Sequence, residues 1–210
     1  VDVPVAESTT AVSCEFELFE TAEPVAADAA EECAWETSMV LKEEEFSRAL
    51  SLALFDYMRK SYSRGFVLSL SGGADSATMA VLVKLMIDFA VKEIGLSGVA
   101  HRLRHCFENS VPETSEKWVG ELLWCVYQAT RNSGEITRDA AESIAHAIGA
   151  QFYELNVDGV VEEYKSLVSG ALQRELTWDR DDLALQNIQA RGRAPSVWML
   201  ANIKRGLLLA

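Results

Sequence analysis

Residues 66–76 read Phe66-Val67-Leu68-Ser69-Leu70-Ser71-Gly72-Gly73-Ala74-Asp75-Ser76, and this stretch indicates the fold of the chain more clearly than any other. Residues 66–70 are a short apolar run, which is typical of a buried parallel strand. The next six residues form a glycine-rich turn, and helical spacing then predicts a helix over residues 77–91 that ends near Gly95. A strand, a tight turn and a helix in this order form one unit of an α/β protein.

The same unit recurs along the chain. Strands are predicted at residues 122–129, 152–157 and 207–210, and helices at 43–60, 137–148, 160–172 and 182–204, the last perturbed by Gly192 and Pro195. This alternation predicts an α/β fold with a doubly wound parallel sheet. The helix at 43–60 has an apolar stripe, which predicts its buried face: Phe46, Ala49, Leu50, Ala53, Leu54 and Tyr57. A parallel strand is normally followed by a crossover, so a chain that stops in its fourth strand is expected to be truncated at the C-terminus.

Acidic charge is concentrated in the N-terminal segment. The net charge is −13, but residues 1–45 hold 13 acidic residues against Lys42 alone, so residues 46–210 carry a net charge of −1. Without a basic stripe, no nucleic-acid partner is expected. Residues 1–40 lack a sustained period and contain Pro4 and Pro24, which predicts an acidic linker. No apolar run is long enough for a membrane span, and the absence of Lys and Arg from residues 1–20 predicts a cytoplasmic protein.

The turn at residues 71–76 has the properties of an anion-binding site. Two glycines allow a backbone to turn tightly and to approach an oxyanion, and a helix N-terminus adds outward N–H groups and a positive dipole end. Ser71 and Ser76 can donate hydroxyl hydrogen bonds to phosphate oxygens, whereas Asp75 would repel a bare phosphate and so indicates a divalent cation such as Mg²⁺. The alternative is a glycine-rich connector with a Ser or Asp helix cap. The P-loop, dinucleotide and nucleophile-elbow patterns do not occur.

The strand-Ser-Gly-Gly-x-Asp-Ser-helix pattern resembles the pyrophosphate loop of N-type ATP pyrophosphatases. A second motif, Leu185-Gln186-Asn187-Ile188-Gln189-Ala190-Arg191, resembles a helix of NAD⁺ synthetases. Residues 61–67 (SYSRGFV) and 126–137 (VYQATRNSGEIT) resemble their glutamine-dependent form, so the resemblance covers about residues 43–210. Two spaced motifs in a matching α/β context are more specific than either alone. The resemblance implies an adenine nucleotide alpha-hydrolase-like fold.

The resemblance also implies a reaction and a set of site residues. The family amidates deamido-NAD⁺ to NAD⁺ through an adenylated intermediate and releases AMP and pyrophosphate; in the glutamine-dependent form the ammonia comes from glutamine. Asn187 and Arg191 match positions that contact deamido-NAD⁺, and Asp75 matches the Mg²⁺ ligand. The residues that would hold the ATP phosphates are Ser69, Leu70, Ser71, Gly72, Gly73, Ala74, Asp75 and Ser76.

Domain organisation is a further implication of the resemblance. Residues 1–40 would be the connector from a glutaminase domain, and residues 41–210 the N-terminal part of the synthetase domain. The family's threonine, acidic metal ligand and lysine that follow the fourth strand are not in this sequence, so the chain alone is expected to be inactive. A homo-oligomer is expected of the full-length protein.

Three alternatives remain open at this stage. The chain could belong to another ATP pyrophosphatase, such as a GMP synthetase or a tRNA-thiolating enzyme, or be a non-catalytic nucleotide-binding module. Paired cysteines, which would favour thiolation, do not occur. Arg191 could be an exposed helix cation paired with Asp or Glu.

Other residues are assigned no catalytic role. His101, His105 and Cys106 are interpreted as a surface loop without a metal, and Cys125 as a buried inert thiol. Residues 130–135 are expected to flank the adenosine. Four tryptophans without a common spacing are interpreted as core or interface residues: Trp118, Trp124, Trp178 and Trp198.

Overall fold

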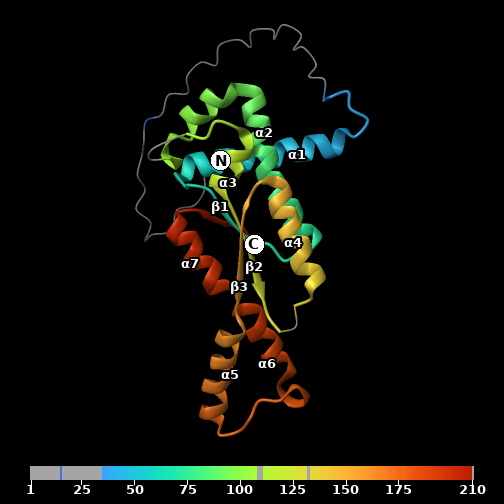
Figure 1. Ribbon diagram of the computed structural model, residues 1–210, viewed down its shortest axis with the longest axis vertical. Coiled ribbons are helices and arrows are strands. Elements are labelled where there is room, and N and C mark those ends of the chain that lie inside the picture. The colour runs from blue at the N-terminus through green and yellow to red at the C-terminus, as the bar shows by residue number, and fades with distance from the viewer. Residues whose placement is uncertain (1–14, 16–34, 108–110, 132, 210) are drawn as a thin grey trace.

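A four-stranded parallel sheet forms the centre of the molecule (Figure 1). The computed structural model describes residue 15 and residues 35–107, 111–131 and 133–209. The strands are β1 (Phe66–Ser69), β2 (Leu123–Ala129), β3 (Gln151–Asn156) and β4 (Leu207–Leu209), in the order β3-β2-β1-β4. Leu68 of β1 pairs with Cys125 on one side and with Leu209 on the other. Each described strand starts within one residue of its predicted position.

Seven α-helices and one 3₁₀ turn are found in the described part of the chain. They are α1 (Leu41–Ser61), α2 (Ala74–Arg102), the 3₁₀ turn Arg104–Cys106, α3 (Ser115–Leu122), α4 (Glu135–Ile148), α5 (Asp158–Leu172), α6 (Trp178–Arg191) and α7 (Ala194–Lys204). None of the described helices is long and apolar enough to cross a membrane.

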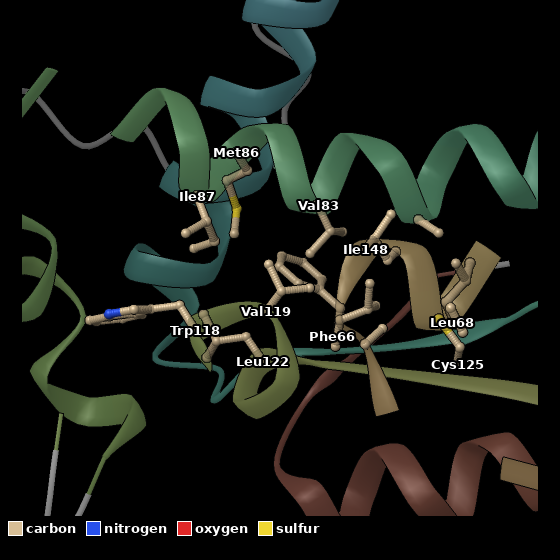
Figure 2. Packing of buried hydrophobic residues seen from close by; sticks show 14 of the residues in the cluster. Phe66, Leu68, Val83, Met86, Ile87, Trp118, Val119, Leu122, Cys125 and Ile148 are labelled. Carbon is tan, nitrogen blue, oxygen red and sulfur yellow. The ribbon is translucent and has the colours of Figure 1, made fainter. Parts of the chain in front are cut away.

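Helices cover both faces of the sheet, because successive side chains of a strand point to opposite faces. Phe66, Leu68 and Cys125 pack beneath α2, α3 and α4, in the larger of two buried clusters (Figure 2). Val67, Trp124 and Val126 point the other way, where the smaller cluster is completed by two residues of α7, Val197 and Ala201. The predicted doubly wound parallel sheet is therefore confirmed.

The helix that begins at Ala74 breaks at Gly95, as predicted. Gly95 has φ +68° and ψ 166°, outside the helical region, and a second helical segment, counted with the first as α2, continues to Arg102. This second segment was not predicted; Val99 and Leu103, which follow the glycine at helical spacing, are completely buried. The surface loop expected at His101 is therefore wrong, because His101 lies in the last turn of the second segment.

Two further boundaries differ from expectation. The helix predicted over residues 182–204 is two helices, because the backbone turns at Gly192 and Arg193 and Pro195 lies in the first turn of α7, where its missing N–H is tolerated. Helix α3 was not predicted. Its apolar residues Trp118, Val119 and Leu122 are followed at once by the apolar residues of β2, so the sequence does not show where helical spacing ends and the strand begins.

The buried face of α1 also differs from the predicted stripe. Ser51, Phe55 and Met58 are its buried residues, whereas Phe46 is 56% exposed and Tyr57 is 64% exposed. Helix α1 has apolar side chains on two faces: Phe55 and Met58 belong to the core cluster, and of the predicted stripe Leu54 is partly buried against that cluster.

Candidate functional site

The glycine-rich loop leaves the sheet at the carboxyl end of β1. The N–H of Leu70, which is buried, donates to the carbonyl oxygen of Val126 at 2.9 Å and so holds the loop entrance to β2. Gly72 has φ +82°, in the left-handed region. A Cβ atom at position 72 would also collide with the carbonyl oxygen of Thr137. Glycine is required at position 72 on both grounds.

Hydrogen bonds within the loop give it a defined shape. The hydroxyl oxygens of Ser71 and Ser76 are 3.1 Å apart, and the N–H of Ser71 donates to Ser76 Oγ at 3.2 Å. The N–H of Gly73 donates to Ser71 Oγ at 3.3 Å, and Ser76 Oγ donates to the carbonyl of Gly73 at 3.2 Å. Both serines therefore face one another across the turn.

Helix α2 begins at Ala74, three residues earlier than predicted, so Asp75 and Ser76 lie in its first turn. Gly73 is the cap residue and has no side chain to cap the helix; its own N–H donates to Ser71 Oγ. First-turn N–H groups have no intrahelical partner, and they lie beside the exposed Ser71 and Gly73. Free first-turn N–H groups beside exposed hydroxyls are the arrangement that an anion site requires, and the assignment of this loop as one stays a prediction.

Asp75 is the acidic group of this site. Its side chain is exposed at the first turn of α2. No group of three or more His, Cys, Asp or Glu side chains suited to a metal ion is found among the described residues. A single carboxylate fits Mg²⁺, which is usually held by one or two carboxylates together with substrate phosphates and water.

The end of β2 borders the same site. Thr137, at the start of α4, lies against Gly72 and shares a hydrogen bond of 2.9 Å with the hydroxyl of Tyr127. Thr130 N–H donates to Ser133 Oγ at 2.9 Å and closes the turn between β2 and α4. Residues 130, 131 and 133–135 follow β2 at its carboxyl end, and Asn132 lies outside the described residues. That residues 130–135 flank the adenosine stays a prediction.

Asn187 and Arg191 lie together on the exposed surface of α6. Arg191 Nη1 donates to Asn187 Oδ1 at 2.6 Å, as their four-residue spacing allows. No carboxylate pairs with Arg191 in the described ranges, so the alternative of a helix cation paired with Asp or Glu is not found there. The structure joins these two residues to each other, but no hydrogen bond between described residues joins them directly to residues 69–76.

A small cavity lies beside α6, beyond the carboxyl ends of β2 and β3, where α5 and α6 extend away from the sheet (Figure 1). Its volume is about 150 Å³, and its lining includes Arg131, Glu162 and Gln189. Arg131 and Glu162 form an ion pair of 3.0 Å. Sites for drug-sized ligands have volumes of about 300–1,000 Å³, so a dinucleotide would not fit inside this cavity.

Two cysteines and a histidine outside the loop are buried or partly buried and take no part in the proposed site. Burial raises the pKa of the Cys125 thiol to about 12, which confirms the expectation of a buried inert thiol. Burial likewise raises the pKa of Cys106 to about 12. His105 Nε2 lies 3.0 Å from the carbonyl oxygen of Ser63, so this histidine is half-buried in contact with the chain instead of free in a surface loop.

One polar residue at the site was missed by sequence reasoning. Gln128, 7% exposed near the end of β2, accepts a hydrogen bond of 2.8 Å from Ser69 Oγ. The sequence feature that could have indicated Gln128 is a single amide side chain within the mostly apolar run of β2.

Comparison with known proteins shows which family the chain belongs to. The family model described as NAD synthase matches residues 46–210. The chain belongs to the NAD synthase family. It is 34% identical over 172 residues to the glutamine-dependent NAD(+) synthetase of Oryza sativa subsp. indica, covering 77% of this chain and 23% of that protein. The corresponding protein of Bos taurus is 36% identical over 170 residues, covering 76% of this chain and 24% of that protein.

A solved structure of a family member supports the fold directly. A crystal structure of a glutamine-dependent NAD(+) synthetase from Cytophaga hutchinsonii matches with a TM-score of 0.74 and 48% sequence identity. The match covers 80% of this chain and 30% of that chain. This NAD synthase family member therefore spans about a quarter of the length of its curated relatives.

Proposed function

We propose that this chain is the ATP-loop part of a glutamine-dependent NAD⁺ synthetase, which converts deamido-NAD⁺ to NAD⁺ with ATP and with ammonia taken from glutamine. The observation that carries the proposal is the loop of residues 71–76 between β1 and α2. It has the geometry of an anion site and lies within the region matched by the NAD synthase family model.

In the proposed reaction, the nicotinate carboxylate first becomes adenylated. A free carboxylate is a poor electrophile, because oxide would have to leave; transfer of AMP to the carboxylate supplies a stable leaving group and releases pyrophosphate. Ammonia then attacks the carbonyl carbon, loses a proton and expels AMP. The protein contributes by positioning the reactants and stabilising the developing charge.

Loop residues would hold the phosphates of ATP. The outward N–H groups at the start of α2 and the hydroxyls of Ser71 and Ser76 would supply the donors, and hydrogen bonds between the two serines set the spacing of their hydroxyls. Asp75 would hold Mg²⁺, which when bound neutralises part of the phosphate charge.

Asn187 and Arg191 would bind deamido-NAD⁺. Their mutual hydrogen bond of 2.6 Å orients the guanidinium on the exposed side of α6, where it can meet a phosphate or a carboxylate. The small cavity behind α6 cannot take the dinucleotide, so this exposed surface is the proposed acceptor side of the site.

The remaining parts of the proposal concern the whole protein. Residues 1–40 would connect to a glutaminase domain, residues 41–210 would be the N-terminal part of the synthetase domain, and the full-length protein would be a cytoplasmic homo-oligomer. We propose that residues 1–210 alone do not synthesise NAD⁺. Asp75 by itself supplies one carboxylate, whereas Mg²⁺ and the transition-state charge need ligands on more than one side.

Calorimetric titration of the chain distinguishes this function from its alternatives. We expect binding of ATP with Mg²⁺ and binding of deamido-NAD⁺, but none of xanthosine monophosphate. Binding of xanthosine monophosphate in place of deamido-NAD⁺ would favour a GMP synthetase-like enzyme. Binding of ATP without either acceptor would favour a nucleotide-binding module, and an absence of ATP binding would contradict the assignment of the loop.

A further inference from the structure

A buried amide links the nucleotide loop to the end of α6. Gln128 points to the same face of β2 as Trp124 and Val126, because it follows them at two-residue spacing. Its Oε1 accepts the 2.8 Å hydrogen bond from Ser69 Oγ, and its Nε2 donates to the carbonyl oxygen of Arg193 at 3.5 Å. One side chain thus contacts two segments that are separated by more than a hundred residues.

Both contacts are at positions that border the proposed ligand sites. Ser69 is the last residue of β1, two residues before the loop, and is one of the residues predicted to hold the ATP phosphates. Arg193 lies in the turn between α6 and α7, two residues after Arg191. A shift of Ser69 can therefore be transmitted through the side chain of Gln128 to the end of α6, the helix that carries Asn187 and Arg191.

The turn that receives this contact is tightly packed. A Cβ atom at Gly192 would lie 3.0 Å from the carbonyl oxygen of Ile188 and 3.1 Å from Val161 Cγ2, so the turn fits closely against α6 and α5. The Arg193 carbonyl also accepts a 2.9 Å hydrogen bond from Ser196 Oγ. Arg193 Nε, in contrast, is buried and has no hydrogen-bond partner among the described residues. The carbonyl oxygen of Arg193 is therefore the atom of this turn that is hydrogen-bonded to the Gln128 side chain of β2.

We propose that Gln128 is a positioning residue that couples the nucleotide loop to helix α6. Occupation of the loop by ATP then changes the affinity of the Asn187 and Arg191 surface for the acceptor through Ser69, Gln128 and Arg193. The inference rests on the proposed function, because that function assigns the two ligands. Burial of an amide without hydrogen bonds destabilises a fold. Here Gln128 Oε1 is bonded to Ser69 and Nε2 to the Arg193 carbonyl, so both polar atoms of the amide have a partner in one of the two segments.

Hydrogen–deuterium exchange of the ligand-free chain tests the physical link. The variant is Gln128→Met, which keeps an unbranched side chain of similar length and removes both hydrogen bonds. The matched control is Gln151→Met, because Gln151 lies at the opposite end of the same sheet, where its amide donates to the Gly120 carbonyl at 2.7 Å and accepts from Tyr153 at 2.8 Å.

We expect Gln128→Met to raise exchange about fivefold in residues 70–77 and in residues 192–196, as loss of one buried hydrogen bond predicts. The control should leave both segments unchanged. Unchanged exchange in either segment of Gln128→Met, or an equal rise in Gln151→Met, would overturn the link.

Calorimetry tests the functional coupling. Dissociation constants for deamido-NAD⁺ are measured with and without saturating α,β-methylene-ATP and Mg²⁺. We expect these constants to differ in the parent chain and to become equal in Gln128→Met, while each ligand alone binds the variant within about threefold of the parent, since a positioning residue touches neither ligand. A purely structural defect would instead weaken each ligand alone.

The two proposals fail in different ways. If the parent binds both ligands but its two constants for deamido-NAD⁺ are equal, or if Gln128→Met keeps the parental ratio, coupling through Gln128 is overturned while the proposed function stands. If the parent binds neither ligand, the proposed function fails and the coupling of ligands fails with it, whereas the exchange experiment still decides whether Gln128 joins the two segments.

Discussion

Asp75 provides the most direct residue-scale test of the nucleotide site. Asp75→Asn is nearly isosteric and affects an exposed side chain, so the fold should stay intact. We expect the Mg²⁺-dependent affinity for ATP to fall at least about tenfold, because a charged hydrogen-bonding or metal contact contributes about 1.5–3 kcal/mol. Calorimetric titration at saturating Mg²⁺ measures the effect. The control is Glu43→Gln, an exposed carboxylate in the first turn of α1. Equal ATP affinity in Asp75→Asn and the parent would contradict the role of Asp75.

Arg191 allows a corresponding test on the acceptor side. Arg191→Ala should weaken deamido-NAD⁺ binding about tenfold and leave ATP binding nearly unchanged, because its guanidinium lies on α6 away from the loop hydrogen bonds. Arg180→Ala, an exposed arginine on the same helix, is the matched control. A selective loss of ATP affinity would move Arg191 to the nucleotide site, and unchanged binding of both ligands would return it to an ordinary surface cation.

At the scale of elements, one ion pair joins the loop after α5 to the first turns of α6. Asp181, at the kink in α6, accepts two hydrogen bonds from Arg174 at 2.8 and 2.7 Å and one from the N–H of Thr177 at 3.0 Å. The Arg174 guanidinium, followed by the Thr177 N–H, holds the pKa of Asp181 well below its usual value of 3.8. The contribution to stability is therefore complete above pH 4 and is lost as the pH falls further toward the folded-state pKa.

We expect Asp181→Asn to reduce stability at pH 7, with the difference from the parent shrinking as the pH is lowered from 4 toward 2. The reason is that protonation removes the same charge in the parent that the substitution removes permanently. Urea unfolding across this pH range measures the effect. A difference between variant and parent that does not depend on pH would show that the ion pair is not its cause.

The two apolar faces of α1 can be distinguished by substitution. Phe55→Ala should lower the free energy of unfolding by about 3–5 kcal/mol, because Phe55 is 8% exposed and belongs to the core. Tyr57→Ala, on the stripe that the sequence pattern favours, should change it by less than about 0.5 kcal/mol, because Tyr57 is 64% exposed. Chemical denaturation compares the two, and equal losses would place both faces of α1 in the core.

At the scale of the whole molecule, three of the described helices, α1, α5 and α7, each present three or more large apolar side chains to solvent. On α7, Trp198 is 62% exposed and Ile203 is 72% exposed. The other exposed apolar residues on these helices include Phe46, Leu52 and Tyr57 of α1, Leu167, Val168 and Leu172 of α5, and Met199 of α7. Surfaces of this kind promote association when nothing covers them.

We therefore expect residues 1–210 to self-associate as concentration rises, because association removes the apolar face of α7 from water. Trp198→Lys with Ile203→Lys should reduce this association, and sedimentation velocity at several concentrations measures it. The control is Lys92→Glu, at an exposed position of α2. It changes charge but removes no apolar side chain. A parent that stays monomeric throughout would contradict the expectation.

Local patterns determined the parallel strands, the glycine-rich loop and the pairing of Asn187 with Arg191. Each depends on neighbours within a few residues: an apolar run, a required left-handed glycine at position 72, and a four-residue helical spacing. For this reason the described strands were predicted to within one residue at their starts, and the loop was assigned correctly as the turn after β1.

Contacts between distant segments decided the rest. Burial of Val99 and Leu103 accompanies a second helical segment after the break at Gly95, and packing against α2 selects Phe55 over Tyr57 as part of the core. The hydrogen bonds of Gln128 join residues 59 and 65 positions away along the chain. No local pattern specifies such partners, because whether a helix face or a buried amide is satisfied depends on which surface the folded chain places against it.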